Sequence, residues 1–261
     1  TQKESFLKYK LPTRPFIHSA QKPEIQKFFQ QHKALVAKKR WNGYDGNGTT
    51  LLKTQAELLK FLEENESYLA DFIFEKFISF QEEIAVQAAR SRAGHIIFFP
   101  FVKTIQKDNK CFLVVGPEKP DLKMQKKISR YLNKIGYVGV MGLEFFKTKT
   151  GLVLNETAPR VHNTGHHTWD SCSVDQFTMH LLCGLQDRLP KIHLKTKNFV
   201  MLNLIGQSTS PVSIPEQSKG NLYWYGKTNR RGRKLGHINF TGETKKSLLK
   251  QALQELKHWK L

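Results

Sequence analysis

The amino-acid sequence predicts an α+β fold in which antiparallel strands and helices alternate. Apolar strand-like runs recur along most of the chain. Between them lie segments whose apolar residues repeat at helical spacing. The sequence shows no internal repeat and no low-complexity linker. Helices that alternate with antiparallel strands favour sheets that are covered on one face.

Four helices are predicted from their start signals and their periodicity. Thr54 and Glu57 form a capping box that opens an amphipathic segment, which runs to about Asn65. Asp121 can cap a helix that Gly136 ends. Two further helices are predicted at residues 174–185 and 243–259.

The strand-like runs lie between and around these helices. They span residues 34–38, 71–77, 83–89, 95–101, 137–146, 151–156, 199–206 and 235–240. The segment from 206 to 220 is rich in Ser and Pro and predicts a loop before a small terminal β unit. We therefore expect one domain at residues 1–190 and a small C-terminal β/α subdomain at residues 191–261.

The chain is strongly basic, with 42 Lys and Arg against 22 Asp and Glu and a net charge of +20. Such a charge fits a nucleic-acid partner, or a lysine-rich protein with a site for small phosphorylated ligands. The cations are spread along the chain, and only residues 226–234 form a dense cluster. No zinc-finger, RNA-recognition or basic heptad pattern accompanies that cluster. The sequence therefore favours small anions over nucleic acid.

The sequence also favours a cytoplasmic protein without a membrane partner. No apolar run approaches the ~20 residues that a membrane helix needs. The first ten residues lack the apolar core of a signal peptide. The three cysteines, Cys111, Cys172 and Cys183, have neither metal-site spacing nor even parity, which indicates reduced thiols. The sequence does not determine the oligomeric state and is compatible with a homodimer.

Residues 137–156 predict a β-hairpin. Residues 149–151 suit a three-residue loop, because such loops end on a left-handed residue and a glycine stands there. This loop sets Glu144 opposite Glu156, and two facing carboxylates are destabilising when left alone. With the amide of Asn155 they suit Mg²⁺ that bridges nucleotide phosphates. The alternatives are that one carboxylate points to solvent, or that the register is shifted by one residue.

A glycine-rich segment at residues 38–50 follows the first predicted strand. Gly43 and Gly48 have the spacing of a phosphate-binding P-loop, but Thr49 stands where that motif needs lysine. Backbone amides of a different glycine loop can still surround phosphate oxygens. The alternative is an ordinary surface turn.

A polar turn follows the hairpin. His162 and His166 have a four-residue spacing that would fit a metal on a helix, but a nearby proline, asparagine and glycine argue against a helix. Arg160, His162 and Asn163 are instead predicted to bind an anion and orient a substrate. The fork of an arginine matches the planar oxygens of a carboxylate or bicarbonate.

Five segments together resemble one family. They are "NGYDGNG" at 42–48, "EKFISFQEEIAV" at 75–86, "GYVGVMGLEFF" at 136–146, "NETAPRVHNTGHHT" at 155–168 and "YGKTNRRGRKLGH" at 225–237. These segments, and the order in which they occur, resemble those of the N5-carboxyaminoimidazole ribonucleotide synthetases. These enzymes are the ATPase subunits of phosphoribosylaminoimidazole carboxylase. The resemblance implies an ATP-grasp fold, in which two α+β subdomains clasp ATP, with a small C-terminal β-rich subdomain. Members of that family normally begin with a dinucleotide-fold-like domain, which these 261 residues do not include.

The resemblance implies a ligase of purine biosynthesis that uses ATP and Mg²⁺. In this family ATP phosphorylates bicarbonate to carboxyphosphate, and the CO₂ unit is transferred to the amine of 5-aminoimidazole ribonucleotide. The implied partners are these small molecules. Two other functions stay open: another ATP-grasp carboxylate–amine ligase, and a non-catalytic nucleotide- or polyanion-binding fragment.

The resemblance also implies a role for individual residues. Lys38 would hold ATP phosphates, residues 43–49 would form a mobile loop over them, residues 75–78 would meet adenine, and Glu83 would accept from ribose. Gln106 stands where the family has a histidine, and Arg231 replaces a proline. The full implied set is Lys38, Gly43, Tyr44, Asp45, Gly46, Asn47, Gly48, Thr49, Glu75, Lys76, Phe77, Ile78, Glu83 and Asn155 for ATP; Glu144 and Glu156 for the metal; Arg160, His162, Asn163 and Lys227 for catalysis; and Asp45, Arg160, Lys227, Arg230, Arg233 and Lys234 for the substrate.

Overall fold

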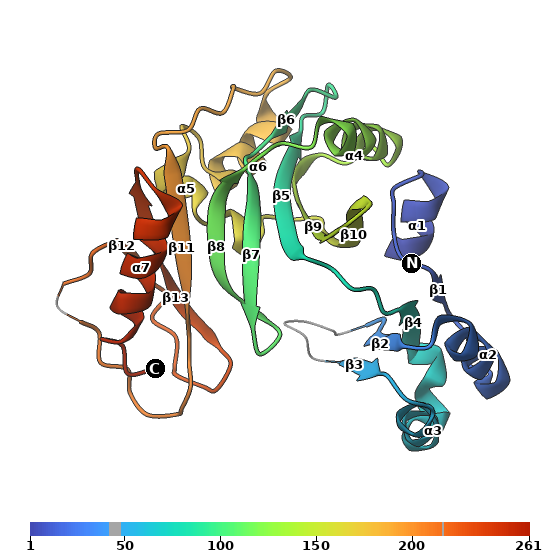
Figure 1. The fold of residues 1–261 in the computed structure, drawn as a ribbon. Helices are drawn as coiled ribbons and strands as arrows, with labels where there is room; N and C mark the ends of the chain where they lie inside the picture. Colours follow the sequence, from blue (N-terminus) through green and yellow to red (C-terminus); the bar gives the residue numbers. More distant parts are fainter. Residues whose placement is uncertain (42–47, 216) are drawn as a thin grey trace. The chain divides into compact units, whose positions relative to one another are not determined.

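A computed structural model describes residues 1–41, 48–215 and 217–261 of the chain (Figure 1). The chain divides into two compact units, Thr1–Gln81 and Glu82–Leu261. Both units combine helices with antiparallel sheets, so the predicted α+β class is confirmed. Within the described residues no helix has both the length and the apolar character needed to cross a bilayer.

The first unit is built on a four-stranded antiparallel sheet with the strand order β1-β4-β2-β3. Its strands are β1 (Phe16–Ile17), β2 (Leu35–Lys39), β3 (Thr49–Leu52) and β4 (Phe72–Lys76), and its helices are α1 (Gln2–Lys8), α2 (Lys22–His32), α3 (Gln55–Glu64) and the 3₁₀ helix η1 (Glu66–Asp71). The capping box predicted at Thr54 opens α3. Helix α1 was not predicted, although Thr1 and Glu4 form a capping box of the same kind.

The two faces of this first sheet have different roles. Leu35, Ala37, Phe72 and Phe74 pack against apolar side chains of α2 and α3. Because successive side chains of a strand alternate between faces, Lys38 lies on the face opposite to the one that packs against α2 and α3. Glu75 shares that face, since it pairs with Val36 two residues from Lys38.

The second unit is built on a nine-stranded antiparallel sheet. The strand order is β10-β9-β5-β7-β8-β11-β13-β12, and β6 pairs with β5 beside this path. The strands are β5 (Glu82–Arg90), β6 (Ile96–Phe98), β7 (Phe101–Lys107), β8 (Lys110–Glu118), β9 (Gly139–Thr148), β10 (Gly151–Ala158), β11 (Asn198–Ile205), β12 (Asn221–Trp224) and β13 (Lys234–Gly242). The prediction of a single strand at residues 95–101 is wrong, because this segment contains β6 and the start of β7.

The helices of the second unit are α4 (Leu122–Lys134), η2 (Asn163–Gly165), α5 (Thr168–Ser171), α6 (Gln176–Leu185) and α7 (Lys245–Leu256). The predicted start of α4 is confirmed, because Asp121 accepts from the backbone N–H of Met124. Helix α7 buries Leu248 and Ala252 against β11 and β13.

The predicted domain boundary at residue 190 stays a prediction. Across it, β8 pairs with β11, so strands from both predicted domains belong to one sheet (Figure 1). The loop before the last strands is followed by β12 and β13, which extend the same sheet rather than form a separate one.

Candidate active site

The hairpin of β9 and β10 brings two carboxylates face to face. The predicted three-residue loop is wrong: Gly151 already pairs with Thr148, so the turn holds two residues. The register next to the turn is therefore shifted by one residue from the predicted one. A bulge at Asn155 then adds one residue to β10 and restores the predicted pairing of Glu156 with Glu144. The facing carboxylates are confirmed, but they depend on the bulge.

The donor set at this hairpin fits Mg²⁺. Glu144 is half-buried and Glu156 is exposed, and the residue at the bulge in β10 is Asn155. Within residues 1–41, 48–215 and 217–261, no three His, Cys, Asp or Glu side chains gather to hold a metal. Mg²⁺ is commonly bound by one or two carboxylates, with water and substrate phosphates as its other ligands. Two facing carboxylates therefore suit this ion better than one that needs a full protein cage.

His162 lies against the hairpin in a fixed position. A Cβ atom on Gly142 would come within 2.6 Å of the His162 Cβ, so the two residues approach as closely as glycine permits. The side chain of Gln176 holds the backbone of His162 from both sides. Its Oε1 accepts from the His162 N–H at 2.9 Å, and its Nε2 donates to the His162 carbonyl at 2.8 Å.

The hydrogen bonds of the turn assign the His162 tautomer. Gln87 donates to the Thr164 hydroxyl at 2.8 Å, and that hydroxyl lies 2.8 Å from His162 Nδ1. The Thr164 N–H also points at Nδ1, at 3.4 Å. Nδ1 is thus the acceptor, and Nε2 carries the proton. Nε2 lies 3.6 Å from Glu144 Oε1.

Burial, followed by the charges of Arg160 and Lys234, lowers the pKa of His162 to about 4. The imidazole is therefore neutral at pH 7. It can donate a hydrogen bond next to Glu144 without adding a positive charge.

The polar turn is not an α-helix, as predicted from its sequence. It forms a single 3₁₀ turn, η2, and the His166 ring packs at a tilt against the rings of Trp169, Phe177 and His237. Gly165 is required here, since a Cβ atom would come within 2.4 Å of Gln176 Oε1.

The cationic segment 226–234 meets this turn. Lys234 Nζ donates to Asn163 Oδ1. Lys227 and Lys234 both lie over the ring of Tyr225, with their Nζ atoms 5.0 and 5.6 Å from its centroid. The structure thus brings together Asn163, Lys227 and Lys234, which the sequence predicted as site residues.

The predicted arginines are less closely connected. Arg160 is exposed and donates to the Val161 carbonyl at 2.9 Å. Arg233 donates to the Thr228 carbonyl at 3.5 Å, and Arg230 is exposed. These contacts with the backbone hold Arg160 and Arg233 near their own turns and leave their exposed groups facing solvent.

Asp170 anchors the segment after the turn to the end of the sheet, and the sequence analysis missed it. It accepts from Asn221 and Asn239 at 2.6 Å and from the Tyr223 hydroxyl at 3.1 Å. Asn239 also donates to the carbonyl of His166, at 3.2 Å. These contacts join residues about 50 to 70 positions apart, and no local spacing pattern signals them.

We expect the second unit to lose stability in mild acid. Burial is the main cause that lowers the pKa of His162 to about 4, of His166 to about 2, and of His167 and His237 to about 3. Below pH 6.5 the unfolded chain therefore binds more protons than the native one, and the free energy of unfolding falls as pH falls. Below pH 6.5, each histidine lowers the free energy of unfolding by up to about 1.4 kcal/mol per pH unit, until the pH reaches the folded pKa of that histidine. Urea unfolding midpoints measured from pH 7.5 to 5 should fall steeply below pH 6.5.

A variant tests whether these histidines cause the acid sensitivity. His166→Phe keeps an aromatic ring in the stack and removes one titrating group, so the slope below pH 6.5 should become smaller. His258→Gln, at an exposed position, is the control and should leave the slope unchanged. An unchanged slope in His166→Phe would contradict the assignment.

The first unit carries a buried cluster of three cations around one carboxylate. Glu75 is 1% exposed; Arg14 Nε lies 2.7 Å from it, and the ammonium groups of Lys3 and Lys38 lie 3.4 Å away. Burial alone would raise the pKa of Glu75, but Lys38, Lys3 and Arg14 outweigh it and lower that pKa. Burial lowers the pKa of Lys3 to about 7, so Arg14 and Lys38 carry most of the positive charge at neutral pH. Their charge exceeds that of the one carboxylate, so the cluster suits a polyphosphate. The sequence pointed to Lys38 and Glu75 but missed Lys3 and Arg14.

Several predicted nucleotide residues surround this cluster or lie outside the described chain. Gly48 has φ +80°, and its carbonyl accepts from the Lys39 N–H at 2.8 Å. Thr49 opens β3 opposite Lys38. The backbone N–H groups of Lys76 and Phe77 donate to the Pro15 and Ala34 carbonyls. Gly43, Tyr44, Asp45, Gly46 and Asn47 lie outside the described residues, and the roles of Ile78 and of Glu83 on β5 stay predictions.

Comparisons with known proteins show the family to which this chain belongs. The ATP-grasp domain family matches residues 4–177, and the phosphoribosylaminoimidazole carboxylase C-terminal domain matches residues 200–251. The N5-carboxyaminoimidazole ribonucleotide synthase of Haemophilus influenzae is 34% identical over 265 residues, which cover 96% of this chain and 70% of that protein. The chain belongs to the N5-carboxyaminoimidazole ribonucleotide synthase family of ATP-grasp proteins.

Other members of the synthase family agree with this assignment. The crystal structure of the Thermus thermophilus synthetase matches with a TM-score of 0.84 and 30% identity, over 98% of this chain and 70% of that one. The predicted ATP-grasp fold is thereby confirmed. The Vibrio vulnificus synthase is 35% identical over 80% of this chain, but the match spans only 57% of that synthase.

Proposed function

We propose that the natural protein carboxylates 5-aminoimidazole ribonucleotide to N5-carboxyaminoimidazole ribonucleotide in purine biosynthesis, with ATP and bicarbonate. The main support is the pair of facing carboxylates, Glu144 and Glu156, beside the neutral His162. Membership of the synthase family supplies the reaction. The activity is proposed for the whole protein, because the matched chain spans 57% of the Vibrio vulnificus relative.

The first unit is proposed to bind the nucleotide. Lys38 would contact the phosphates. Glu75 would hold the ammonium group of Lys38 in place, because the two side chains lie 3.4 Å apart. Lys3 and Arg14 add positive charge that attracts the polyphosphate. Residues 43–49 would cover the phosphates. In the second unit, Glu83 would accept from the ribose.

The hairpin is proposed to bind Mg²⁺ through Glu144 and Glu156, with Asn155 as a third oxygen donor. When bound, this ion would offset the charge that the phosphoryl group carries during its transfer. The carboxylates themselves fix where the cation can bind, because the bulge holds them on the same face of the hairpin.

The polar turn is proposed to bind bicarbonate. Arg160 offers a planar pair of donors, and His162 offers one N–H without adding a charge. An oxygen of bicarbonate attacks the γ-phosphorus of ATP, ADP leaves, and carboxyphosphate forms. The amine nitrogen of the aminoimidazole then forms a bond to the carboxyl carbon and loses a proton. The leaving inorganic phosphate takes the electron pair of the broken C–O bond and that proton.

The cationic segment is proposed to bind the substrate phosphate. Lys227 and Lys234 converge over Tyr225, and Lys234 also holds Asn163, so the phosphate subsite is coupled to the bicarbonate turn. Arg230 and Arg233 would add charge from the same segment. Charge-assisted hydrogen bonds to a phosphate dianion are among the stronger polar contacts in proteins.

Release of ADP by the full-length protein tests this proposal. ADP should form only when bicarbonate is present, and its formation should be accompanied by carboxylation when 5-aminoimidazole ribonucleotide is added. Dependence on a different amine substrate would favour another ATP-grasp carboxylate–amine ligase. No ADP release under any of these conditions would favour a non-catalytic binding protein.

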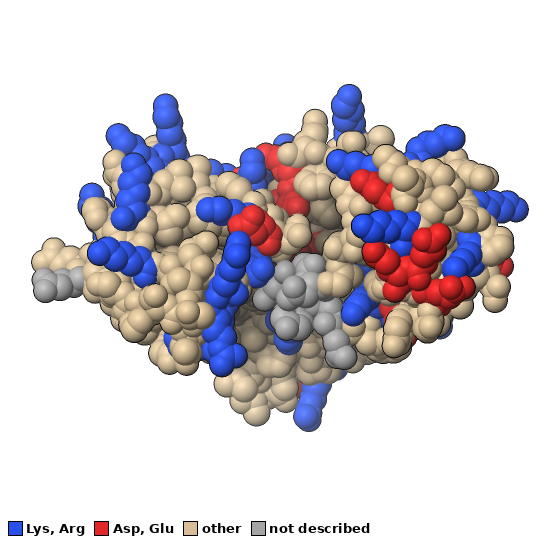
Figure 2. Space-filling view, turned by 90° about the horizontal axis from the view of Figure 1, so that it is seen from below, with Lys and Arg blue, Asp and Glu red and all other residues tan. Residues whose placement is uncertain are grey.

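We expect only weak binding to duplex DNA. Figure 2 shows lysine and arginine side chains scattered over the displayed face rather than gathered in one continuous stripe. Non-specific binding through scattered charges is lost steeply as salt rises. Electrophoretic mobility shifts at low and physiological salt should show a complex only at low salt. A sequence-selective complex at physiological salt would contradict the prediction that the partners are small anions and not nucleic acid.

A cytoplasmic location and a homodimer stay predictions.

A further inference from the structure

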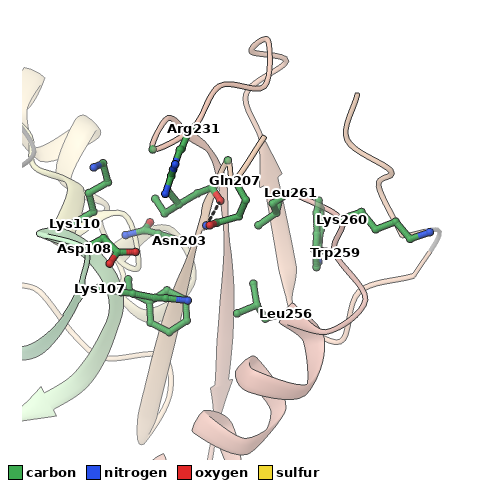
Figure 3. A pocket seen from close by; sticks show the side chains of 14 residues that line it. Lys107, Asp108, Lys110, Asn203, Gln207, Arg231, Leu256, Trp259, Lys260 and Leu261 are labelled. Atoms are coloured by element: carbon green, nitrogen blue, oxygen red, sulfur yellow. Dashed lines mark hydrogen bonds between the residues drawn. The ribbon is translucent and has the colours of Figure 1, made fainter. Parts of the chain in front are cut away.

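A cavity of about 520 Å³ opens in the second unit. Its lining includes Arg231 and Gly232 of the cationic segment but none of the residues that are given a role in the proposed active site. Four segments line it: the tip of the β7–β8 hairpin, the end of β11, residues 231–232, and the end of α7 with the tail that follows (Figure 3). Small-molecule sites commonly have volumes of about 300–1,000 Å³. The cavity is therefore large enough for a small organic ligand.

The cavity is strongly cationic. Lys107, Lys110, Arg231 and Lys260 line it, and Asp108 is the acidic side chain among its lining residues. Across the three described ranges, none of these four cations takes part in an ion pair. The excess charge is thus available to a ligand, and it favours an anion.

Two of the cations are held next to each other. A Cβ atom on Gly232 would lie 3.0 Å from Lys110 Cε and 3.2 Å from its Nζ, so the Lys110 ammonium group packs against the residue that follows Arg231. Figure 3 shows the Arg231 side chain on the same side of the cavity as Lys110. The loop itself is fixed, because the Gly232 N–H donates to the Gly206 carbonyl at 2.7 Å and the Gly206 N–H donates to the Arg233 carbonyl at 2.9 Å.

The other side of the cavity is apolar. Phe112, Leu256, Trp259 and Leu261 line it. Trp259 is buried and stacks on Trp224 with ring centroids 5.7 Å apart, so its position is fixed by the core. A rigid aromatic wall of this kind is suited to a planar ring.

We propose that this cavity binds a small aromatic phosphate monoester, with its phosphate against Lys110 and Arg231 and its ring against Phe112 and Trp259. An inorganic anion would leave the apolar wall unfilled, and a neutral ring would leave the cations without a partner. A phosphate joined to a ring satisfies both sides at once. The proposal does not depend on the reaction proposed above.

Calorimetric titration of the 261-residue chain with 1-naphthyl phosphate tests this site, in the presence of excess ATP so that a nucleotide site is occupied. We expect saturable binding, with inorganic phosphate and 1-naphthol each at least about tenfold weaker, because each satisfies one wall only. Arg231→Ala and Lys110→Ala should each weaken binding about tenfold, since each removes a charge-assisted contact. Lys123→Ala on the exposed face of α4 is the control and should change nothing.

A second readout uses the wild-type chain. Bound 1-naphthyl phosphate should protect Lys110 from acetylation, measured by mass spectrometry, and leave Lys123 reactive. Displacement of the probe by ATP, equal binding of inorganic phosphate, or binding that neither variant weakens would each overturn the proposal. Absence of binding together with unprotected Lys110 would do the same.

Discussion

Replacing Glu156 with glutamine should lower Mg²⁺-dependent ATP cleavage by at least about a hundredfold in the full-length protein, and Glu144→Gln should do the same. Each change keeps the shape of the side chain and removes one of the two charges that face each other across the hairpin. A single carboxylate binds the cation more weakly, and the phosphoryl group then loses a partner for its charge during transfer. Initial rates of ADP formation, measured over a range of Mg²⁺ concentrations, check this result.

Glu118→Gln provides a matched control for these variants. Glu118 lies on β8 of the same sheet and forms an ion pair with Lys245 at 2.7 Å. A pair of this partly exposed kind contributes about 1 kcal/mol or less, so the control should retain near-normal rates. Normal rates and normal Mg²⁺ dependence in both hairpin variants would show that these carboxylates do not bind the metal.

Arg160→Ala and Arg233→Ala should fail in different ways. Arg160 lies at the turn proposed to bind bicarbonate, so its loss should lower ATP cleavage about a hundredfold, with or without 5-aminoimidazole ribonucleotide. Arg233 belongs to the segment proposed to bind the ribonucleotide phosphate. Its loss should raise the KM for that substrate about tenfold and leave bicarbonate-dependent ATP cleavage largely intact.

Steady-state kinetics with each substrate varied in turn separate these two defects. Arg188→Ala, at an exposed position after α6, serves as the control for the loss of one arginine and should behave as the wild type. Identical defects in Arg160→Ala and Arg233→Ala would refute the proposed division of roles. No effect of Arg233→Ala would show that this part of the segment is only a solvated charged turn.

The sequence predicted the main helices because their signals are local. Thr54, Asp121 and the leucines of α7 act within one or two turns of their own helix, so the local sequence holds all the information that the chain uses there. The same holds for Glu156 and the arginine turn, because Arg160 follows Glu156 by four residues along the chain. Strand β8 carries an apolar run, Cys111–Gly116, that strand propensity could also have identified.

The pairing of Glu144 with Glu156 was predicted by two errors that cancel. The turn is one residue shorter than the glycine at its end suggested, and the bulge at Asn155 adds one residue back. A bulge depends on the packing of both strands and leaves no clear mark in the sequence. The register of a hairpin is therefore less predictable than its existence.

Contacts between distant segments could not be predicted from local patterns. Lys3 and Arg14 contact Glu75, and Asp170 contacts Tyr223 and Asn239, although these residues lie far apart in the sequence. Helical or strand periodicity reports which face of an element is apolar, but not which other element packs on it. These contacts hold the proposed site residues in place, so the structure adds the supporting residues that the sequence analysis missed.

The fate of the oxygen atoms of bicarbonate tests the proposed reaction most directly. Full-length protein is mixed rapidly with ATP, Mg²⁺, 5-aminoimidazole ribonucleotide and ¹⁸O-labelled bicarbonate, and the inorganic phosphate is examined by mass spectrometry before the label exchanges with water. If bicarbonate attacks the γ-phosphorus, one of its oxygens must remain on the phosphate that leaves, so the phosphate should carry one ¹⁸O atom. Phosphate without label, released at the same rate as ADP, would mean that water attacks ATP and would contradict the proposed carboxyphosphate route.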